Sequence, residues 1–443
     1  MKKISNRVEI RNIQDFPMEV ESEFDIESEF DIESEVNEFQ DDDDFESYFT
    51  SDTLEKVREK FKNFVMKVNE FAKPTIIQTY WQLSRENDEY LDPRYQKKYG
   101  KSVQNLDSKA IEFFQTELNN IKLAIGYAQE EKEWERVIEI SENLRRFLSI
   151  RTYWDELEKI QKYALEAAIE AEDNLAYPRI LNQLGEIDRL RGHAGDGINK
   201  CEESRLIFQS LHDVNGEAKA LYNLGYLNRS LGNLAESAES FEAALKLFRS
   251  IRHSQNMDED IAEALDGLGQ VYTRQGKLEQ AKKVLLESLG IKQELDNRFS
   301  TSKTYNNLGK VYIEFYNKQK QLEYLEEAKK LFEKSLEIKR ELGDRQGEGT
   351  SLNELGKVHR LMNECEKAID YYNKSLEVKS KVSATEGGVP DRHGQGLTYM
   401  EMGLLYEEQR EEEKARNYFQ LALDYLNNYS PEFKQISKRI QKT

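Results

Sequence analysis

The chain has 443 residues, with 64 Lys and Arg against 84 Asp and Glu, and a formal net charge of −20. This length exceeds the usual size of one compact domain, so we expect either several domains or an elongated repeat architecture. The acidic balance and the lack of an arginine-rich block argue against direct nucleic-acid binding, which requires positive charge.

Residues 1–50 are predicted to be an acidic low-complexity tail. From Met1 to Glu55 there are 4 basic and 19 acidic residues, and every odd position from Glu19 to Glu35 is acidic. This alternation has the period of a strand, but repulsion among the carboxylates predicts disorder in isolation. Two interpretations stay open: a solubilising leader, or an autoinhibitory pseudo-ligand that docks in a groove of this chain or of a second copy.

No targeting or membrane segment is evident in the sequence. The basic start, "MKKISNRVEI", is followed by no apolar core of signal-peptide length, and no window is apolar enough to span a bilayer. Cys201 and Cys365 have the spacing of neither a disulfide framework nor a zinc site. We therefore expect a soluble, cytoplasmic protein.

Residues 51–115 are predicted to form an N-terminal helical cap region. Apolar residues step by three and four from Leu54 to Phe71, with Pro74 just beyond, which indicates an amphipathic helix. Its polar residues include Glu as well as Lys, which favours packing on the first repeats over membrane binding. Residues 116–175 are predicted to be degenerate repeat-like helices.

Six copies of one pattern occupy residues 176–443, followed by a short C-terminal helix. Each copy has a glycine in a first segment, and these glycines are spaced 40, 44, 40, 47 and 47 residues apart: Gly185, Gly225, Gly269, Gly309, Gly356 and Gly403. A second segment carries small residues seven apart, which predicts two helices per copy that approach closely. Bulky residues between the small ones are expected to fill the space between the paired helices: Cys201, Phe241, Leu285, Phe332, Tyr372 and Phe419.

The pattern resembles the tetratricopeptide repeat in a long form, with a period near forty rather than thirty-four. The resemblance implies an all-α fold, a right-handed α-α superhelix. Two copies depart from it, because Asp188 and Asn228 stand where later copies have tyrosine. The 47-residue spacings mark insertions near residues 316–325 and 383–389, which are candidate contact points.

Residues 61–168 resemble the lead into the repeat sensor of STAND-type regulatory ATPases. No G-x-x-x-x-G-K-[ST] loop exists anywhere in the chain, so the ATPase itself is missing. No motif indicates catalysis, a cofactor or a metal, since the five histidines stand singly and abundant carboxylates do not by themselves make an acid and base pair. We predict a protein that is not an enzyme.

The predicted binding site is the concave wall made by the first helices of successive copies. Asparagine amides can hold the backbone of an extended peptide, while Lys and Arg can bind its carboxylates or phosphates. An ordinary solvated face with helical salt bridges is the alternative. The predicted peptide-binding residues are Asn182, Arg189, Asn223, Arg229, Arg274, Asn306, Asn307, Lys310, Asn353, Lys357 and Arg360.

Two functional hypotheses follow from the sequence. The first is a non-catalytic adaptor or scaffold that binds an acidic or extended protein segment in this groove and is autoinhibited by its own tail. The second is the sensor or regulatory subunit of a bacterial signalling, transcription-control or defence system that acts with a separately encoded effector. Neither nucleic acid nor membrane is an expected direct partner.

Overall fold

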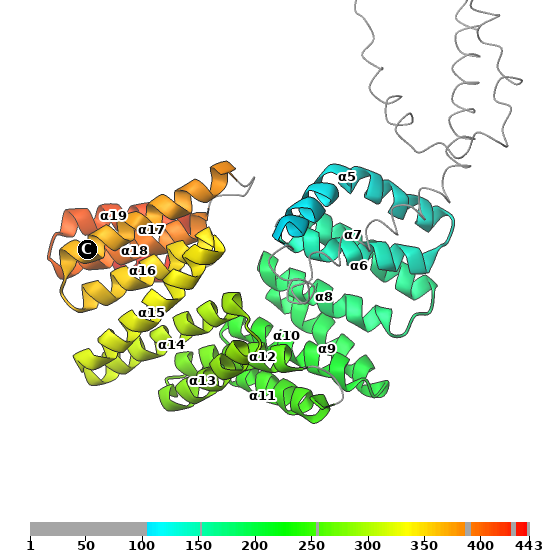
Figure 1. The fold of residues 1–443 in the computed structure, drawn as a ribbon, viewed down its shortest axis with the longest axis horizontal. Helices are drawn as coiled ribbons and strands as arrows, with labels where there is room; N and C mark the ends of the chain where they lie inside the picture. The colour runs from blue at the N-terminus through cyan, green and yellow to red at the C-terminus, as the bar shows by residue number, and fades with distance from the viewer. Residues whose placement is uncertain (1–103, 151–152, 254–256, 386–390, 427–430, 441–443) are drawn as a thin grey trace, which may run out of the picture. The chain divides into compact units, whose positions relative to one another are not determined.

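The computed structural model describes residues 104–150, 153–253, 257–385, 391–426 and 431–440, and this part of the chain contains helices and no strand (Figure 1). The chain divides into two compact units, Met1–Pro74 and Thr75–Thr443, and the described residues all belong to the second. The predicted tail, most of the predicted cap region and most of the insertion at 383–389 lie outside the described residues. The helices are α5 (Gln104–Glu130), α6 (Trp134–Ile150), α7 (Trp154–Glu170), α8 (Ala176–Arg191), α9 (Ala194–Ser210), α10 (Val214–Leu231), α11 (Leu234–Ile251), α12 (Asp258–Arg274), α13 (Leu278–Glu294), α14 (Arg298–Gln319), α15 (Leu322–Leu342), α16 (Arg345–Leu361), α17 (Cys365–Thr385), α18 (Arg392–Glu408), α19 (Glu412–Tyr425) and α20 (Pro431–Ile440).

From α8 to α19 the helices pack in six hairpins. The pairs are α8 with α9, α10 with α11, α12 with α13, α14 with α15, α16 with α17 and α18 with α19. Each second helix also packs on the first helix of the next hairpin, and first helices touch one another, as α8 touches α10 and α16 touches α18. The predicted all-α, right-handed superhelix is confirmed. The short C-terminal helix is α20, which packs on α19.

The two helices of each hairpin approach very closely at the repeat glycine. A methyl group added to Gly309 would lie 2.6 Å from the ring of Phe332, and one added to Gly356 would lie 2.5 Å from the ring of Tyr372. Carbon atoms in contact normally lie about 3.5–4.0 Å apart, so a side chain does not fit there. The bulky residues predicted to fill the hairpins are all buried: Cys201, Phe241, Leu285, Phe332, Tyr372 and Phe419.

Buried serines on the second helices add a hydrogen bond to this contact. Ser288 Oγ donates to the carbonyl of Ala262 at 2.8 Å, and Ser375 Oγ donates to the carbonyl of Gly349 at 2.7 Å. The corresponding donors of two other hairpins are Ser204 and Ser335. Serine is small enough for the close approach, and its hydroxyl is satisfied by the partner helix.

Buried lysines connect the later hairpins to their neighbours. Lys339 Nζ donates to Ser351 Oγ at 3.0 Å, and Lys379 Nζ donates to Thr398 Oγ1 at 3.0 Å, so each lysine reaches the first helix of the next hairpin. Both side chains are almost completely buried. Burial lowers the pKa of both ammonium groups to about 8, since a hydroxyl partner compensates poorly for lost water.

Lys292 holds the same position in the third hairpin but has carboxylate partners. Its Nζ lies 2.8 Å from Asp266 Oδ2 and 2.9 Å from Glu263 Oε1. Burial alone would lower the pKa of this lysine, but the two carboxylates outweigh burial and raise it. In the first two copies Phe208 and Phe248 occupy the position, so the same junction is apolar there.

The insertion at residues 316–325 packs against both neighbouring hairpins. It lengthens α14 and α15, and Lys318 Nζ donates to the carbonyl of Gly276 at 2.7 Å. On the other side, Tyr316 Oη donates to the carbonyl of Leu361 at 3.3 Å. The insertion therefore connects its own hairpin to the hairpins on both sides by hydrogen bonds. No helix in the described part of the chain has the length and apolarity needed to cross a membrane.

We expect Gly309→Ala to destabilise the stack because its new methyl group would overlap the Phe332 ring. Overpacking of this kind costs roughly 1–3 kcal/mol, which exceeds the ~1 kcal/mol that alanine gains over glycine in a helix. Gly290 on α13 is the matched control, since nothing lies within 4 Å of an added Cβ there. Urea midpoints should fall for Gly309→Ala and rise slightly for Gly290→Ala; equal shifts would contradict the packing argument.

We expect Lys339→Met to raise stability at pH 7 and to reduce its dependence on pH. The native pKa of about 8 lies below the ordinary 10.5, so the unfolded chain binds more protons between these values. Wild-type stability should therefore rise as pH increases through this window, and the variant should lose part of that rise. Urea midpoints from pH 7 to 10 measure the slope, with exposed Lys283→Met as control. An unchanged slope in Lys339→Met would refute the burial argument.

Candidate functional site

The first helices form a continuous row that carries all of the predicted binding residues. We call the surface of α8, α10, α12, α14, α16 and α18 the first-helix wall. In Figure 1, α9, α11 and α13 lie along the outer side of this part of the stack, and α10 and α12 lie inside them. The wall is therefore built from successive copies of the same helix, and each copy contributes equivalent positions.

The predicted binding residues differ in accessibility. Four of the eleven are buried, and these have little surface to offer a ligand: Asn182, Asn306, Asn353 and Arg360. The half-buried ones are Arg189, Asn223, Arg229, Asn307 and Lys357, and the exposed ones are Arg274 and Lys310. A ligand on the wall would meet mainly the seven accessible side chains.

Two arginines lie over one tyrosine ring at the N-terminal end of the wall, and a third arginine lies beside them. The guanidinium carbon of Arg229 lies 4.7 Å from the centre of the Tyr226 ring, and that of Arg189 lies 5.5 Å from it. A nitrogen of Arg274 donates to the backbone carbonyl of Arg229 at 3.4 Å. We call Arg189, Arg229 and Arg274 the arginine cluster; it spans α8, α10 and α12.

The other cations among the predicted binding residues pair with carboxylates from the next hairpin. Lys310 Nζ lies 3.4 Å from Glu354, Lys357 Nζ lies 3.7 Å from Glu401, and Arg360 lies 2.9 Å from Glu401. Arg360 also pairs with Glu408. We call these pairs the ion-pair ladder; it links α14, α16 and α18.

The electrostatics of the ladder show that its charges neutralise one another. Burial opposes ionisation of Glu354, but Lys310 and Lys357 outweigh it and lower the pKa of this carboxyl. Glu401 raises the pKa of Lys357 against the effect of burial. Arg360 is desolvated as well, and Glu401 nevertheless raises the pKa of its guanidinium. The C-terminal half of the wall is therefore held together by its own charges.

Buried asparagines join neighbouring first helices. Asn223 Nδ2 donates to Asn182 Oδ1 at 3.1 Å, which ties α8 to α10. Ser351 Oγ donates to Asn306 Oδ1 at 3.2 Å, which ties α14 to α16. These amides have a structural partner already, while Asn307 stays half-buried on the wall.

The carboxylates of the ladder were not among the predicted binding residues. Glu354 and Glu401 both stand two residues before a repeat glycine, and each faces the lysine that follows the glycine of the preceding copy. The signal was present in the repeat alignment, because Glu appears at this position only in the last two copies. Comparing one copy with the next would have found it.

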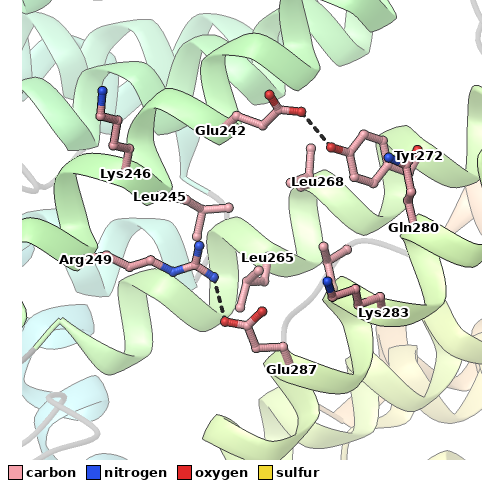
Figure 2. A pocket seen from close by; sticks show the side chains of 11 residues that line it. Glu242, Leu245, Lys246, Arg249, Leu265, Leu268, Tyr272, Gln280, Lys283 and Glu287 are labelled. Carbon is pink, nitrogen blue, oxygen red and sulfur yellow. Dashed lines mark hydrogen bonds and ion pairs between the residues drawn. The ribbon is translucent and has the colours of Figure 1, made fainter.

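A hollow of about 540 Å³ lies between the second helices α11 and α13. Its edges are bridged by two pairs, Tyr272 Oη donating to Glu242 at 2.6 Å and Arg249 bonded to Glu287 at 2.6 Å (Figure 2). Leucines form its floor: Leu245, Leu265 and Leu268. We call it the second-helix groove; none of its residues was among the predicted binding residues.

Family models for the tetratricopeptide repeat match this chain at residues 218–250, 262–295, 315–381 and 398–425. The chain is a tetratricopeptide repeat protein. The matches fall on the second to sixth predicted copies. The first copy, α8 and α9, forms the same kind of hairpin. No curated protein matches the sequence.

Solved structures show the same fold at low sequence identity. One is a STAND protein with a tetratricopeptide repeat sensor from Pyrococcus horikoshii, at 14% identity and a TM-score of 0.51, covering 83% of this chain and 54% of that one. Another is the apo form of RapI, at 13% identity and a TM-score of 0.51, covering 69% of this chain and 99% of that one. The tetratricopeptide repeat protein resembles the former's sensor region in fold.

Tetratricopeptide repeats build scaffolds for protein–protein interaction, and members of the family are generally non-catalytic. The matched repeats therefore indicate an interaction scaffold whose partners are proteins.

We expect Arg360→Gln to destabilise the protein strongly because it leaves the buried Glu401 without its closest cation. Breaking a buried pair from one side costs roughly 3–5 kcal/mol, whereas an exposed pair contributes about 0–1 kcal/mol. Arg249→Gln, which breaks the half-exposed pair with Glu287, is the control. Thermal unfolding of both variants measures the difference. Similar losses would show that the ladder is no stronger than a surface pair.

Proposed function

We propose that this scaffold binds an extended, acidic protein segment along the first-helix wall. The observation that carries the proposal is the division of the wall into two halves. The ladder neutralises its own charges, while the arginine cluster has no carboxylate partner within the described residues. An acidic segment supplies the missing negative charge.

The half-buried Asn307 and the exposed Lys310 extend the proposed contact toward the middle of the wall. Asn307 presents an amide that can both donate to and accept from a peptide backbone. Lys310 lies 3.4 Å from Glu354 with nearly half of its side chain exposed, so a ligand carboxylate can compete for it. The proposed path thus runs from α8 to α14.

A regulatory role is the second candidate, favoured by the fold likeness to a STAND protein with a repeat sensor. In this second candidate function, the scaffold is the sensing part of a pathway whose effector is a separately encoded protein. The acidic segment from Glu19 to Glu35 is then a candidate autoinhibitor; it lies outside the described residues, and its docking stays a hypothesis from the sequence.

We expect Asn307→Ala combined with Lys310→Ala to reduce capture of protein partners from the native host. Both changes remove wall contacts of the ligand, and neither residue is in the hydrophobic core. The matched control is Lys246→Ala combined with Lys283→Ala, two exposed lysines of the second-helix groove. Quantitative mass spectrometry of captured proteins compares the two. Identical partner sets for wild type and wall variant would refute the proposal.

The same capture with residues 1–50 deleted separates the two candidates. A regulatory protein with a docked tail should change its partners and lose hydrogen-exchange protection between Asn182 and Arg360 when the tail is removed. A constitutive scaffold should show neither change. Unchanged protection would discard self-docking.

A further inference from the structure

The arginine cluster is unusual in a chain with twenty more acidic than basic residues. Several arginines elsewhere in the stack pair with carboxylates, for example Arg249 with Glu287 and Arg252 with Asp258. Within the described residues, the three arginines of the cluster form no such pair. Their polar contacts are the side chain of Gln270, which accepts from Arg229, and a backbone carbonyl.

Two carboxylates near the cluster bind another cation. Glu263 and Asp266 influence the ionisation of Tyr226, which places them beside the cluster. Both carboxylates bind Lys292, at 2.9 and 2.8 Å. The positive charge of the cluster is therefore not balanced by these groups, although they lie on the same helix as Arg274.

The three guanidinium groups are close enough to disturb one another. Burial lowers the pKa of Arg229, and the charges of Arg274 and Arg189 lower it further. Gathering like charges in a partly desolvated place costs stability unless a counterion is bound. The ring of Tyr226 holds two of the guanidinium groups in place, which preorganises them for a planar or branched oxyanion.

We propose that Arg189, Arg229 and Arg274 form an oxyanion-binding subsite for a peptide that carries closely spaced negative charges, with Tyr226 positioning the guanidinium groups. This inference rests on the proposed function, which it deepens by naming the recognised group. The oxyanions are carboxylates of neighbouring acidic residues or a phosphorylated side chain, since both offer the oxygens that arginine binds in fork geometry. The subsite lies at one end of the wall, so it also sets the register in which the peptide binds.

The first test uses inorganic pyrophosphate with the full chain. Binding to the native state should raise the melting temperature of the wild type, and Arg229→Gln should abolish most of that shift. Arg249→Gln changes the net charge equally on the outer side of the stack and should keep the full shift. The absence of a shift in wild type, or an equal shift in Arg229→Gln, would overturn the proposal.

The second test identifies the source of the oxyanion. Three nine-residue peptides alternate alanine with glutamate, with phosphoserine or with glutamine, and fluorescence anisotropy measures their binding. We expect the two charged peptides to bind, the glutamine peptide to bind at least tenfold more weakly, and Arg229→Gln to weaken the charged peptides at least tenfold. A clear preference for the phosphoserine peptide over the glutamate peptide assigns the subsite to phosphorylated ligands. Equal affinities for these two peptides assign it to acidic ligands. Equal binding of all three would overturn the inference.

A stability measurement separates a ligand subsite from a structural role. Without ligand, Arg229→Gln should keep or raise the melting temperature, because it removes repulsion within the cluster. A lower melting temperature would assign the cluster to the fold instead. If Arg229→Gln leaves partner capture intact while Asn307→Ala with Lys310→Ala abolishes it, the inference fails and the proposed function stands. If pyrophosphate binding depends on Arg229 but no wall substitution affects capture, the cluster binds oxyanions and the proposed function fails, and with it the assignment of a peptide ligand to the cluster.

Discussion

The close approach of two helices at each repeat glycine is the constraint on which the rest of the structure depends. With no side chain on Gly309, the ring of Phe332 lies directly against the first helix, and the other hairpins repeat this arrangement. Because each hairpin has the same internal spacing, each second helix meets the next first helix in an equivalent way. Equivalent positions on successive first helices then line up as one wall, which is the condition for any binding surface in this fold.

Polar groups between the hairpins change along the stack. The early junctions use phenylalanines such as Phe248, while the later ones use buried lysines such as Lys339 and Lys379. A buried phenylalanine stabilises a junction through the hydrophobic effect, which has no preferred direction. A lysine that donates to hydroxyl groups stabilises the junction only in a particular geometry, because hydrogen bonds are directional. The later hairpins are thus joined by oriented hydrogen bonds and ion pairs, and the lengthened α14 and α15 add further bonds to both neighbours. The same half of the stack carries the ion-pair ladder.

The hairpins could be predicted from the sequence because their cause is local. Glycine, small residue and bulky residue recur at fixed spacing, and the spacing alone determines which helix faces meet. The wall could be predicted only in part, because the burial of a side chain on it depends on a residue in the neighbouring copy. Arg360 was predicted to face a ligand, and its burial follows from Glu401, which stands 41 positions later. Asp188, a departure from the repeat pattern, is buried and finds its partner in Lys200 of the same hairpin.

Charge distribution along the wall follows from the conflict between stability and binding. A cation that pairs with the next hairpin stabilises the stack, and a ligand must then compete with that partner for it. A cation without a partner is available, and it lowers stability until a ligand arrives. In this chain the two uses are separated in space, with paired charges on α14, α16 and α18 and unpaired arginines on α8, α10 and α12. Acidic residues are in excess in this chain, yet within the described residues these three arginines form no ion pair, and a bound ligand explains that feature most directly.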